Sequence, residues 1–442
     1  MNNNPSAPPA GPRPVLDLKD ATALVVGIVV GAGIFQLPAL IAANTGDGKT
    51  MMLAWLLGGV ISLLGALCYA ELATAHPNAG GEYHFLQRAY GLEVARLFAW
   101  ARMTVIASGA IASFAFVFAD YTTQLLRLGE YSSSVWAALL ILALTGINIV
   151  GLKAGKATQN VLTLILCAGL VLVTAAGVLV PAPDAAAVQP VSPPGALHLA
   201  MVFVLFTYGG WNDAAYLSAE IKNGERNIVR SLVYGLLVVT ALYMLVSSAY
   251  LVGLGMTGLA KSPAPAADLL QRAWGKGGAA LISVIVGLAA ITSANATMLT
   301  GARTNYALGR DWPMFRWLGR WHGARSVPMN AMLLQAAIAL ALVVLGTYTR
   351  KGFQTMVEYT APVFWLFFFL VGMSLFVFRT WETQTPGRFR VPYYPFTPLI
   401  FCGVCVYMLY SSLAYTGAGA LVGVAVLAVG ALLVIVSPRQ AE

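Results

Sequence analysis

Long uncharged apolar runs alternate with short polar connections along the whole chain. About twelve of these runs are close to 20 residues long, which is the length a helix needs to cross the hydrocarbon core of a bilayer. The runs begin near Ala21, Met51, Arg96, Ser134, Val161, Leu197, Ile228, Gly277, Met329, Phe353, Phe396 and Leu421. This pattern predicts an all-α membrane protein with about 12 transmembrane helices.

Four connections carry patterns of their own. Residues 80–91 are too polar to span a bilayer and predict an interfacial helix, and residues 261–278 predict a short amphipathic helix. The segment 181–195 is rich in proline and of low complexity. The aromatic and basic segment 311–328 predicts a helix on the membrane surface, with anionic lipid as a possible contact.

Composition and charge agree with a membrane protein. Only 10% of the 442 residues are charged and 59% are hydrophobic, whereas a soluble protein carries about a quarter charged residues. The net charge of +9 could indicate nucleic acid, but a cytoplasmic N-terminus places 19 of the 26 Lys and Arg on the cytoplasmic side. This is the positive-inside bias. We therefore expect a bacterial-type plasma (inner) membrane protein with both termini in the cytoplasm and no nucleic-acid partner.

The N-terminus and the cysteines add little chemistry. Residues 1–17 are mostly polar and rich in proline, which predicts a disordered cytoplasmic tail without a cleavable signal. The CxxC of Cys402 and Cys405 has no second cysteine pair and no nearby histidine. We expect no metal and no cofactor.

Two apolar runs are interrupted by glycines at their midpoints. The first run contains GAG at 31–33, within GIVVGAGIFQLP (27–38), and the sixth contains TYGGWN at 207–212. These are the first spans of two consecutive sets of five, and since five is odd the second set must be inverted. Such paired interruptions point to the binding site of a transporter. We predict repeats over 18–182 and 196–380, followed by two helices over 391–438.

The chemistry of two facing breaks suits a zwitterion. Freed amides at the start of a half-helix favour a carboxylate, and freed carbonyls at the end of the preceding half-helix favour an ammonium group. An alternative is that Gly27 and Gly31 form a GxxxG packing motif. A nucleotide-binding loop is disfavoured, because GAGIFQ lacks the third glycine and no strand precedes it.

Several segments resemble the amino acid–polyamine–organocation superfamily, and most closely its L-type amino acid transporters. These segments are VGIVVGAGIF (26–35), GALCYAEL (65–72), GGEY (80–83), YGGWN (208–212), EIKNGERN (220–227), ANATMLTGAR (294–303) and VPYYPFTPLIF (391–401). The resemblance implies a leucine-transporter-like fold, with a 5+5 inverted repeat, broken helices 1 and 6, and two C-terminal helices. It also implies a substrate site, formed by Val29, Gly31, Ala32, Gly33, Phe206, Thr207, Gly209, Asn212, Asn295 and Trp365.

Roles within that site follow from the same resemblance. The amides of residues 31–33 would hold the substrate carboxylate, and carbonyls around Val29, Phe206, Thr207 and Gly209 would hold its amino group. Phe206 would act as a gate, and Trp365 would lie near the side-chain pocket. The chain departs from the family pattern at Ala32, where a serine is common, and at Leu166, where a lysine is common. Leu166 leaves the coupling mechanism open.

Charged residues in or beside the spans are functional candidates. Asp213 directly follows YGGWN and could carry a proton or favour a cationic substrate, or could simply cap the following half-helix. Glu71, Asp120 and Glu358 are further candidates, and Arg102 needs a partner that the sequence does not identify.

The function expected from these features is secondary transport of amino acids by alternating access, as an exchanger or a permease. Neutral L-amino acids are the first expectation, and proton-coupled transport of cationic amino acids or polyamines is the alternative. A multispan enzyme is disfavoured, since the chain has neither HExxH nor GxSxG, and a channel suits two breaks less well than an occluded site. The loop 127–134 contains no cysteine, so we expect no disulfide-linked heavy chain, and a monomer or weak homo-oligomer.

Overall fold

The computed structural model describes residues 17–78, 80–150, 156–181, 197–213, 221–222, 224–322, 327–381, 388–414 and 417–437, and side chains are described there except at 156–163 and 224–225. In these ranges the chain is almost entirely helical. The first half contains α1 (Leu18–Val29), the 3-10 helix η1 (Ala32–Phe35), α2 (Leu37–Thr45), α3 (Gly48–Ala75), α4 (Glu82–Tyr90), α5 (Leu92–Ala101), the π-helical turn η2 (Arg102–Ile106), α6 (Ala107–Leu125), α7 (Ser132–Val150) and α8 (Lys156–Leu179).

The second half continues the bundle. Its elements are α9 (Leu197–Thr207), α10 (Gly224–Lys261), α11 (Pro265–Asp311), the 3-10 helix η5 (Pro313–Phe315), α12 (Met329–Thr349), α13 (Gly352–Trp381), α14 (Phe396–Ala414) and α15 (Ala418–Val436). Trp274 and Gly275 have non-helical backbone angles and divide α11 into a short first part and a long second part. The short part is the amphipathic helix predicted within 261–278, and α4 is the helix predicted within 80–91.

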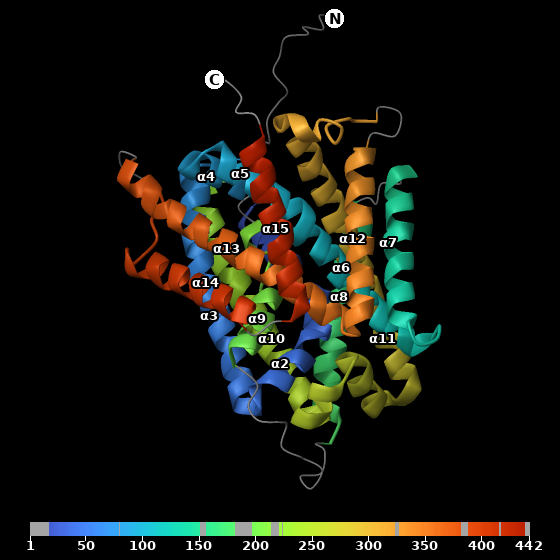
Figure 1. The fold of residues 1–442 in the computed structure, drawn as a ribbon. Coiled ribbons are helices and arrows are strands. Elements are labelled where there is room, and N and C mark those ends of the chain that lie inside the picture. The colour runs from blue at the N-terminus through green and yellow to red at the C-terminus, as the bar shows by residue number, and fades with distance from the viewer. Residues whose placement is uncertain are drawn as a thin grey trace, which may run out of the picture.

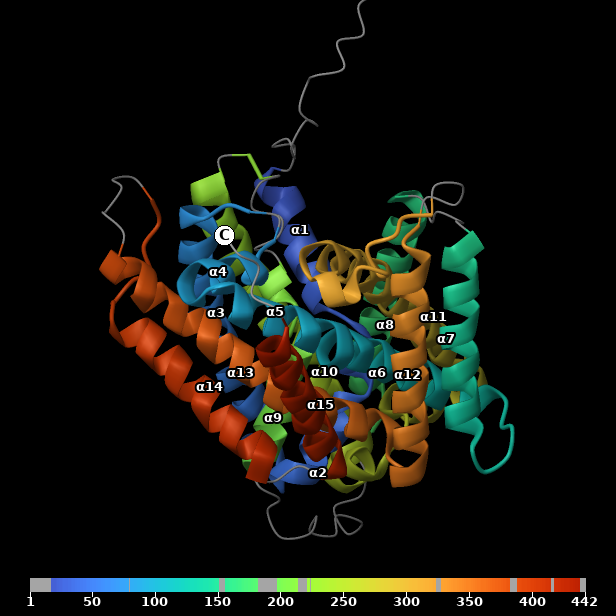
Figure 2. The same cartoon turned by 45° about the horizontal axis from the view of Figure 1, so that its top comes forward.

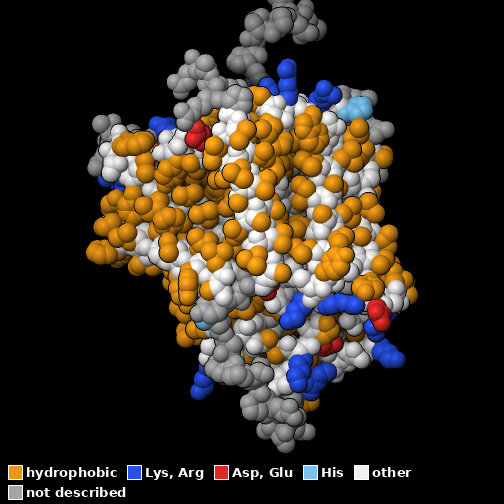
Figure 3. Space-filling view, in the orientation of Figure 1, with side chains coloured by type: hydrophobic (Ala, Val, Ile, Leu, Met, Phe, Trp, Pro, Cys, Tyr) orange, Lys and Arg blue, Asp and Glu red, His pale blue; other side chains and the backbone are white. Residues whose placement is uncertain are grey.

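Nine of the described helical segments are long and apolar enough to cross a membrane. The other three of the twelve predicted spans are the two interrupted ones, which form α1–η1–α2 and α9, and the fifth, which forms α8. Figure 1 shows these helices as one bundle, with the first and last described residues at the same face, which we call the N-terminal face. In Figure 3 hydrophobic side chains cover the middle of the visible surface, and charged ones gather toward its two ends.

The core lies where the two interrupted spans meet the long helices. α2 packs against α9 and α10, η1 packs against α6 and α11, and α1 packs against α10. Figure 2 shows α13 and α14 together at one edge of the bundle and α7 and α12 together at the other. Residues from both halves of the chain therefore surround the interrupted spans.

One predicted element is wrong. Where we expected a surface helix over 311–328, the described residues form only the 3-10 turn η5 and an isolated bridge between His322 and Val327. α11 ends at Asp311, and Pro313 begins η5 two residues later. The chain then turns back, so that the backbones of Gly309 and Gly319 are in contact. A side chain at either glycine would collide with the opposite backbone, so this segment folds as a tight turn.

Candidate functional site

The first interruption is a break in the helix. α1 ends at Val29, and Gly31 has an extended backbone and begins η1. The N–H groups of Ala32 and Gly33 therefore lie at the N-terminal end of η1, where a helix leaves its first donors without an internal acceptor. The Gly31 N–H donates to the Val29 carbonyl at 2.9 Å. Two of the three predicted amides therefore have no acceptor within η1, and their role toward a carboxylate stays a prediction.

The GxxxG packing alternative is wrong for this segment. A Cβ atom built on Gly27 would meet nothing within 4 Å, and one on Gly31 would meet only the Phe114 ring, at 3.9 Å. A packing glycine lies against a neighbouring helix at close range. Gly31 has an extended backbone at the break, whereas Gly27 lies within α1 with open space beside it.

The second interruption approaches the first directly. α9 ends at Thr207, and Gly210 has φ +108° in the turn that follows. A Cβ on Gly210 would lie 3.1 Å from the backbone oxygen of Ile28, the residue before Val29. Glycine is required here both by the left-handed backbone and by the close approach of the two chains.

A single hydroxyl connects the two breaks. The Tyr243 hydroxyl of α10 lies 2.9 Å from the Val29 carbonyl oxygen and 3.0 Å from the Thr207 carbonyl oxygen. One O–H can donate to only one of these carbonyls at a time. The other is left with a lone pair for a further donor, such as an ammonium group.

Sequence reasoning missed Tyr243 and Gly210 as site residues. Gly210 lies within the YGGWN motif, and a rule that counts both glycines of a break as site residues would have found it. A tyrosine in an apolar span, by contrast, is usually interpreted as a packing residue. The role of the Tyr243 hydroxyl can be recognised only once the positions of the Val29 and Thr207 carbonyls are known.

Gly209 and Trp365, both predicted from the resemblance as substrate-site residues, are close to each other. Both line a small cavity of about 10 Å³, together with Trp211 and Phe368. A single water needs roughly that much space, so no amino acid side chain fits in this cavity as it stands. Phe206, the predicted gate, is partly buried, and its carbonyl accepts a hydrogen bond from the Gly209 N–H at 3.1 Å.

The two predicted asparagines have different surroundings. Asn212 is buried, and its Nδ2 donates to Glu82 Oε1 of α4 at 3.2 Å. Asn295 accepts a hydrogen bond at its Oδ1 from Asn148 Nδ2 of α7 at 2.7 Å. The side-chain oxygen of Asn295 is therefore engaged with α7 rather than with a break.

Arg102 has the partners that the sequence could not identify. Its guanidinium group, at the start of the π-turn η2, lies 3.5 Å from Glu82 Oε2 and 3.8 Å from Asp213 Oδ1. Glu82 also accepts a hydrogen bond from the Tyr69 hydroxyl at 2.8 Å. The Asp213 side chain, just beyond the break, is 44% exposed. π-turns are frequent at functional sites.

Two other acidic candidates hold helices together. Glu71 of α3 accepts two hydrogen bonds at 2.7 Å from Arg379 of α13, and one at 2.6 Å from the Val391 N–H. Glu358 of α13 accepts hydrogen bonds from Gln354 at 2.8 Å and from the Gly417 N–H, just before α15, at 3.3 Å. Leu166 lies in the apolar core and is 8% exposed.

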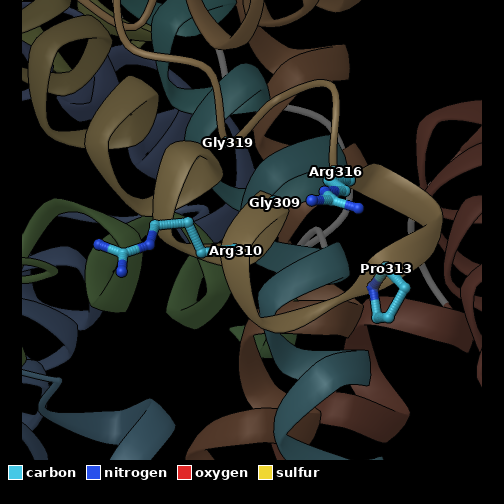
Figure 4. A pocket seen from close by; sticks show the side chains of 5 residues that line it. All are labelled: Gly309, Arg310, Pro313, Arg316 and Gly319. Carbon is cyan, nitrogen blue, oxygen red and sulfur yellow. The ribbon is translucent and has the colours of Figure 1, made fainter.

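A larger hollow, of about 390 Å³, lies near the end of α11 and is lined by Gly309, Arg310, Pro313, Arg316 and Gly319. Figure 4 shows the Arg310 side chain pointing away from Arg316, so the two guanidinium groups do not converge on one ligand. None of its lining residues belongs to a break. Among the described residues no group of three His, Cys, Asp or Glu is placed to hold a metal ion.

Comparison with known proteins gives a consistent result over nearly the whole chain. The sequence profile of the amino acid permease family matches residues 16–437. The chain is 29% identical over 403 residues to the b(0,+)-type amino acid transporter 1 of Mus musculus, covering 87% of this chain and 80% of that protein. It is 27% identical over 410 residues to the serine/threonine exchanger SteT of Bacillus subtilis (strain 168), covering 91% and 92%. It is 26% identical over 419 residues to the large neutral amino acids transporter small subunit 2 of Mus musculus, covering 91% and 78%.

Proposed function

Because this chain belongs to the amino acid permease family and is an amino acid transporter of the L-type kind, we propose that it exchanges neutral L-amino acids by alternating access. The substrate would lie between the breaks of the first and sixth spans. No chemical step is part of the proposed cycle, and its relatives are transporters rather than enzymes.

The observation that carries this proposal is the meeting of the two breaks at Tyr243. The hydroxyl at 2.9 and 3.0 Å from the Val29 and Thr207 carbonyls leaves one carbonyl lone pair for a second donor. The N–H groups of Ala32 and Gly33 face away from any intrahelical acceptor at the start of η1. An α-ammonium and an α-carboxylate are the two groups that would satisfy these acceptors and donors together.

A neutral substrate is favoured by the charges nearest to the second break. Arg102 offsets the charge of Asp213 at 3.8 Å, so the carboxylate is not left free to select a cation. Two of the relatives above are described as exchanging serine and threonine or as transporting large neutral amino acids. These descriptions agree with a neutral side chain without fixing its size.

The second candidate is proton-coupled transport of cationic amino acids or polyamines. It is favoured by the 44% exposure of the Asp213 side chain and by the presence of two carboxylates, Glu82 and Asp213, around one Arg102. Under this alternative Asp213 would carry the proton or face the substrate cation. Asp213→Asn would then change both the preference for substrate charge and the pH dependence of uptake.

The location and assembly follow from the same proposal. The 19 of 26 basic residues on the N-terminal side support a cytoplasmic N-terminal face in a bacterial-type inner membrane. The loop 127–134 offers no cysteine for a covalent heavy chain. We therefore propose a monomer or a weak homo-oligomer with the lipid bilayer as its surroundings.

The proposal is tested by counterflow in proteoliposomes. Liposomes loaded with an unlabelled neutral amino acid should accumulate the labelled one from outside, and empty liposomes should not. Gly33→Val should abolish accumulation, because an added Cβ at Gly33 would lie only 3.3 Å from the Leu37 side chain and the rest of the valine would crowd the start of η1 further. Gly27→Val is the matched control and should remain active, since nothing lies within 4 Å of its Cβ. Folded protein that accumulates no amino acid and no polyamine under sodium or pH gradients would contradict the proposal.

A further inference from the structure

The end of the bundle opposite the N-terminal face is closed by a seam of hydrogen bonds, which we call the outer seam. It joins the half-helix after the first break to α6 and to the segment that precedes α11 (Figure 1). The Tyr121 hydroxyl of α6 donates to the Phe35 carbonyl at 2.7 Å and accepts from the Ala266 N–H at 3.3 Å. Opening this end of the bundle must separate these three elements.

Gln36 is the side chain at the centre of the outer seam. It directly follows η1 and is 8% exposed. Its Nε2 donates to the Pro263 carbonyl at 2.9 Å and to Asp120 Oδ2 at 3.3 Å, while its Oε1 is buried without a hydrogen-bond partner among the described residues. The hydrogen bonds of Gln36 therefore form only when the outer seam is closed, and one of them joins Gln36 to Asp120.

Asp120 is a carboxylate within the membrane-spanning part of α6 whose recorded partners are all neutral. Besides Gln36 it contacts the Ser133 hydroxyl of α7 at 2.5 Å. The titratable groups that face this region are Tyr121 beside it on α6, Tyr250 on α10 and Asp268 on α11, and Asp268 is itself bonded to Ser262. None of these groups is a cation, so in the closed seam the negative charge of Asp120 has no counter-charge in the described part of the chain.

The surroundings of Asp120 suit a proton better than a metal cation. Hard metal cations such as Ca²⁺ and Mg²⁺ are held by several oxygen ligands that converge on one point, and here an N–H of Gln36 points at one of the two carboxylate oxygens. The Ser133 hydroxyl can donate to a carboxylate and can equally accept from a protonated carboxyl. The hydrogen bond at 2.5 Å can therefore persist through protonation.

We propose that Asp120 is a proton-binding site of the outer seam, protonated when the seam is closed and deprotonated when the seam opens to water. Partial burial without a counter-charge disfavours the charged form of a carboxylate, and separation of Gln36 from Asp120 on opening would expose the carboxylate further to water. Proton binding and closure of the seam then favour each other, as linkage requires. Acid on the outer side favours the closed seam, and alkali favours the open one.

The inference rests on alternating access in the proposed function, but its test does not require a substrate. Ala266 is fully buried at the seam, so Ala266→Cys, in a variant with the four native cysteines replaced by alanine, should react with a membrane-impermeant maleimide only when the seam opens. The rate is divided by that of Leu128→Cys, on an exposed loop, because thiol reactivity itself depends on pH. In proteoliposomes at constant internal pH, the normalised rate should fall about threefold or more from about pH 8 to about pH 6 outside.

Variants of Asp120 identify the group responsible. Asp120→Asn should give a slow rate that does not change with pH, because a neutral amide keeps both contacts at every pH. Asp120→Glu should retain the pH dependence, and so should the matched control Asp268→Asn. Replacing sodium with choline should change nothing.

Three results would overturn the inference. They are a normalised rate without pH dependence in the parent protein, an unchanged pH dependence in Asp120→Asn, and a rate that depends on sodium. A protein that fails in counterflow but shows the expected labelling would refute the proposed function and leave the proton site standing.

Discussion

At the scale of single residues, glycines in similar sequence surroundings have different functions here. Gly27 lies in a helix with open space around its Cα, whereas Gly210 combines φ +108° with the Ile28 backbone oxygen 3.1 Å from where its Cβ would be. Only the second position has a conformation and a contact that exclude a side chain. Transport should therefore depend on glycine at position 210 and not at position 27.

Gly210→Ala should therefore abolish or severely reduce transport. The added methyl group is strained by the positive φ and pushes the second break away from the first, so the two half-sites no longer meet. Initial rates of counterflow measure the effect, and Gly146→Ala on α7, where nothing lies within 4 Å of the Cβ, is the control. Transport by Gly210→Ala at the parent rate would show that the contact between the breaks is dispensable.

Tyr243→Phe should weaken substrate binding by about tenfold, corresponding to about 1.4 kcal/mol. The substitution removes the donor that the Val29 and Thr207 carbonyls share, so the two breaks lose the contact that holds them in place around the substrate, and one hydrogen bond contributes about 0.5–1.5 kcal/mol. Substrate-induced thermal shifts of the purified protein measure it. Tyr250→Phe is the matched control, because that buried hydroxyl has no hydrogen-bond partner in the described part of the chain. Equal substrate affinities in the two variants would show that the Tyr243 hydroxyl does not contribute to substrate binding.

The residues that sequence alone could identify are those whose role lies in the backbone. The break at 31–33 and the break after Thr207 follow from glycine content at matched positions in apolar runs. Tyr243 and the partners of Arg102 could not be found in this way, because they depend on which faces of α10, α4 and η2 meet. The role of Asn295 stays a prediction, since its recorded contact is with Asn148 of α7.

At the scale of elements, polar contacts tie some helices together more firmly than others. α3 and α13 are joined by Arg379, which makes two hydrogen bonds at 2.7 Å to Glu71, and the same carboxylate holds the segment before α14 through the Val391 N–H. The Arg379 guanidinium also lies over the Tyr394 ring, at 3.9 Å from its centroid. These helices should therefore move as one unit.

Arg379→Met should lower the stability of the folded protein by about 3 kcal/mol, because it leaves the partly buried Glu71 carboxylate without its counter-charge. The double variant with Glu71→Met should be closer to the parent, since no unpaired charge remains. Thermal unfolding in detergent compares the three proteins. A double variant at least as unstable as Arg379→Met would mean that the ion pair itself, rather than the unpaired carboxylate, decides stability.

Helix positions were predictable at this scale, but one turn was not. Apolar runs fix a span because a membrane demands length and hydrophobicity together. The aromatic and basic pattern of the segment after α11 is compatible with either a surface helix or a series of turns. The close contact between the backbones of Gly309 and Gly319 is possible only if the segment forms turns. That contact joins residues whose proximity no local pattern expresses.

At the scale of the whole molecule, the two ends of the bundle differ. Hydrogen bonds through Gln36 and Tyr121 close the end opposite the N-terminal face. Asp213 follows the second break in the half of the span that leads toward the N-terminal face, and its side chain is 44% exposed. An asymmetry of this kind, with a closed seam on one side of a midplane site, is what one state of an alternating-access cycle requires. The proton site inferred at Asp120 would control the seam that is closed here.

An experimental structure with a transported amino acid bound would show whether the two breaks together hold the substrate. Its carboxylate oxygens should lie within about 3 Å of the Ala32 and Gly33 nitrogens, and its ammonium group at a similar distance from the Val29 or Thr207 carbonyl oxygen. Density for the amino acid at any other place in the bundle, with the two breaks unoccupied, would contradict this prediction.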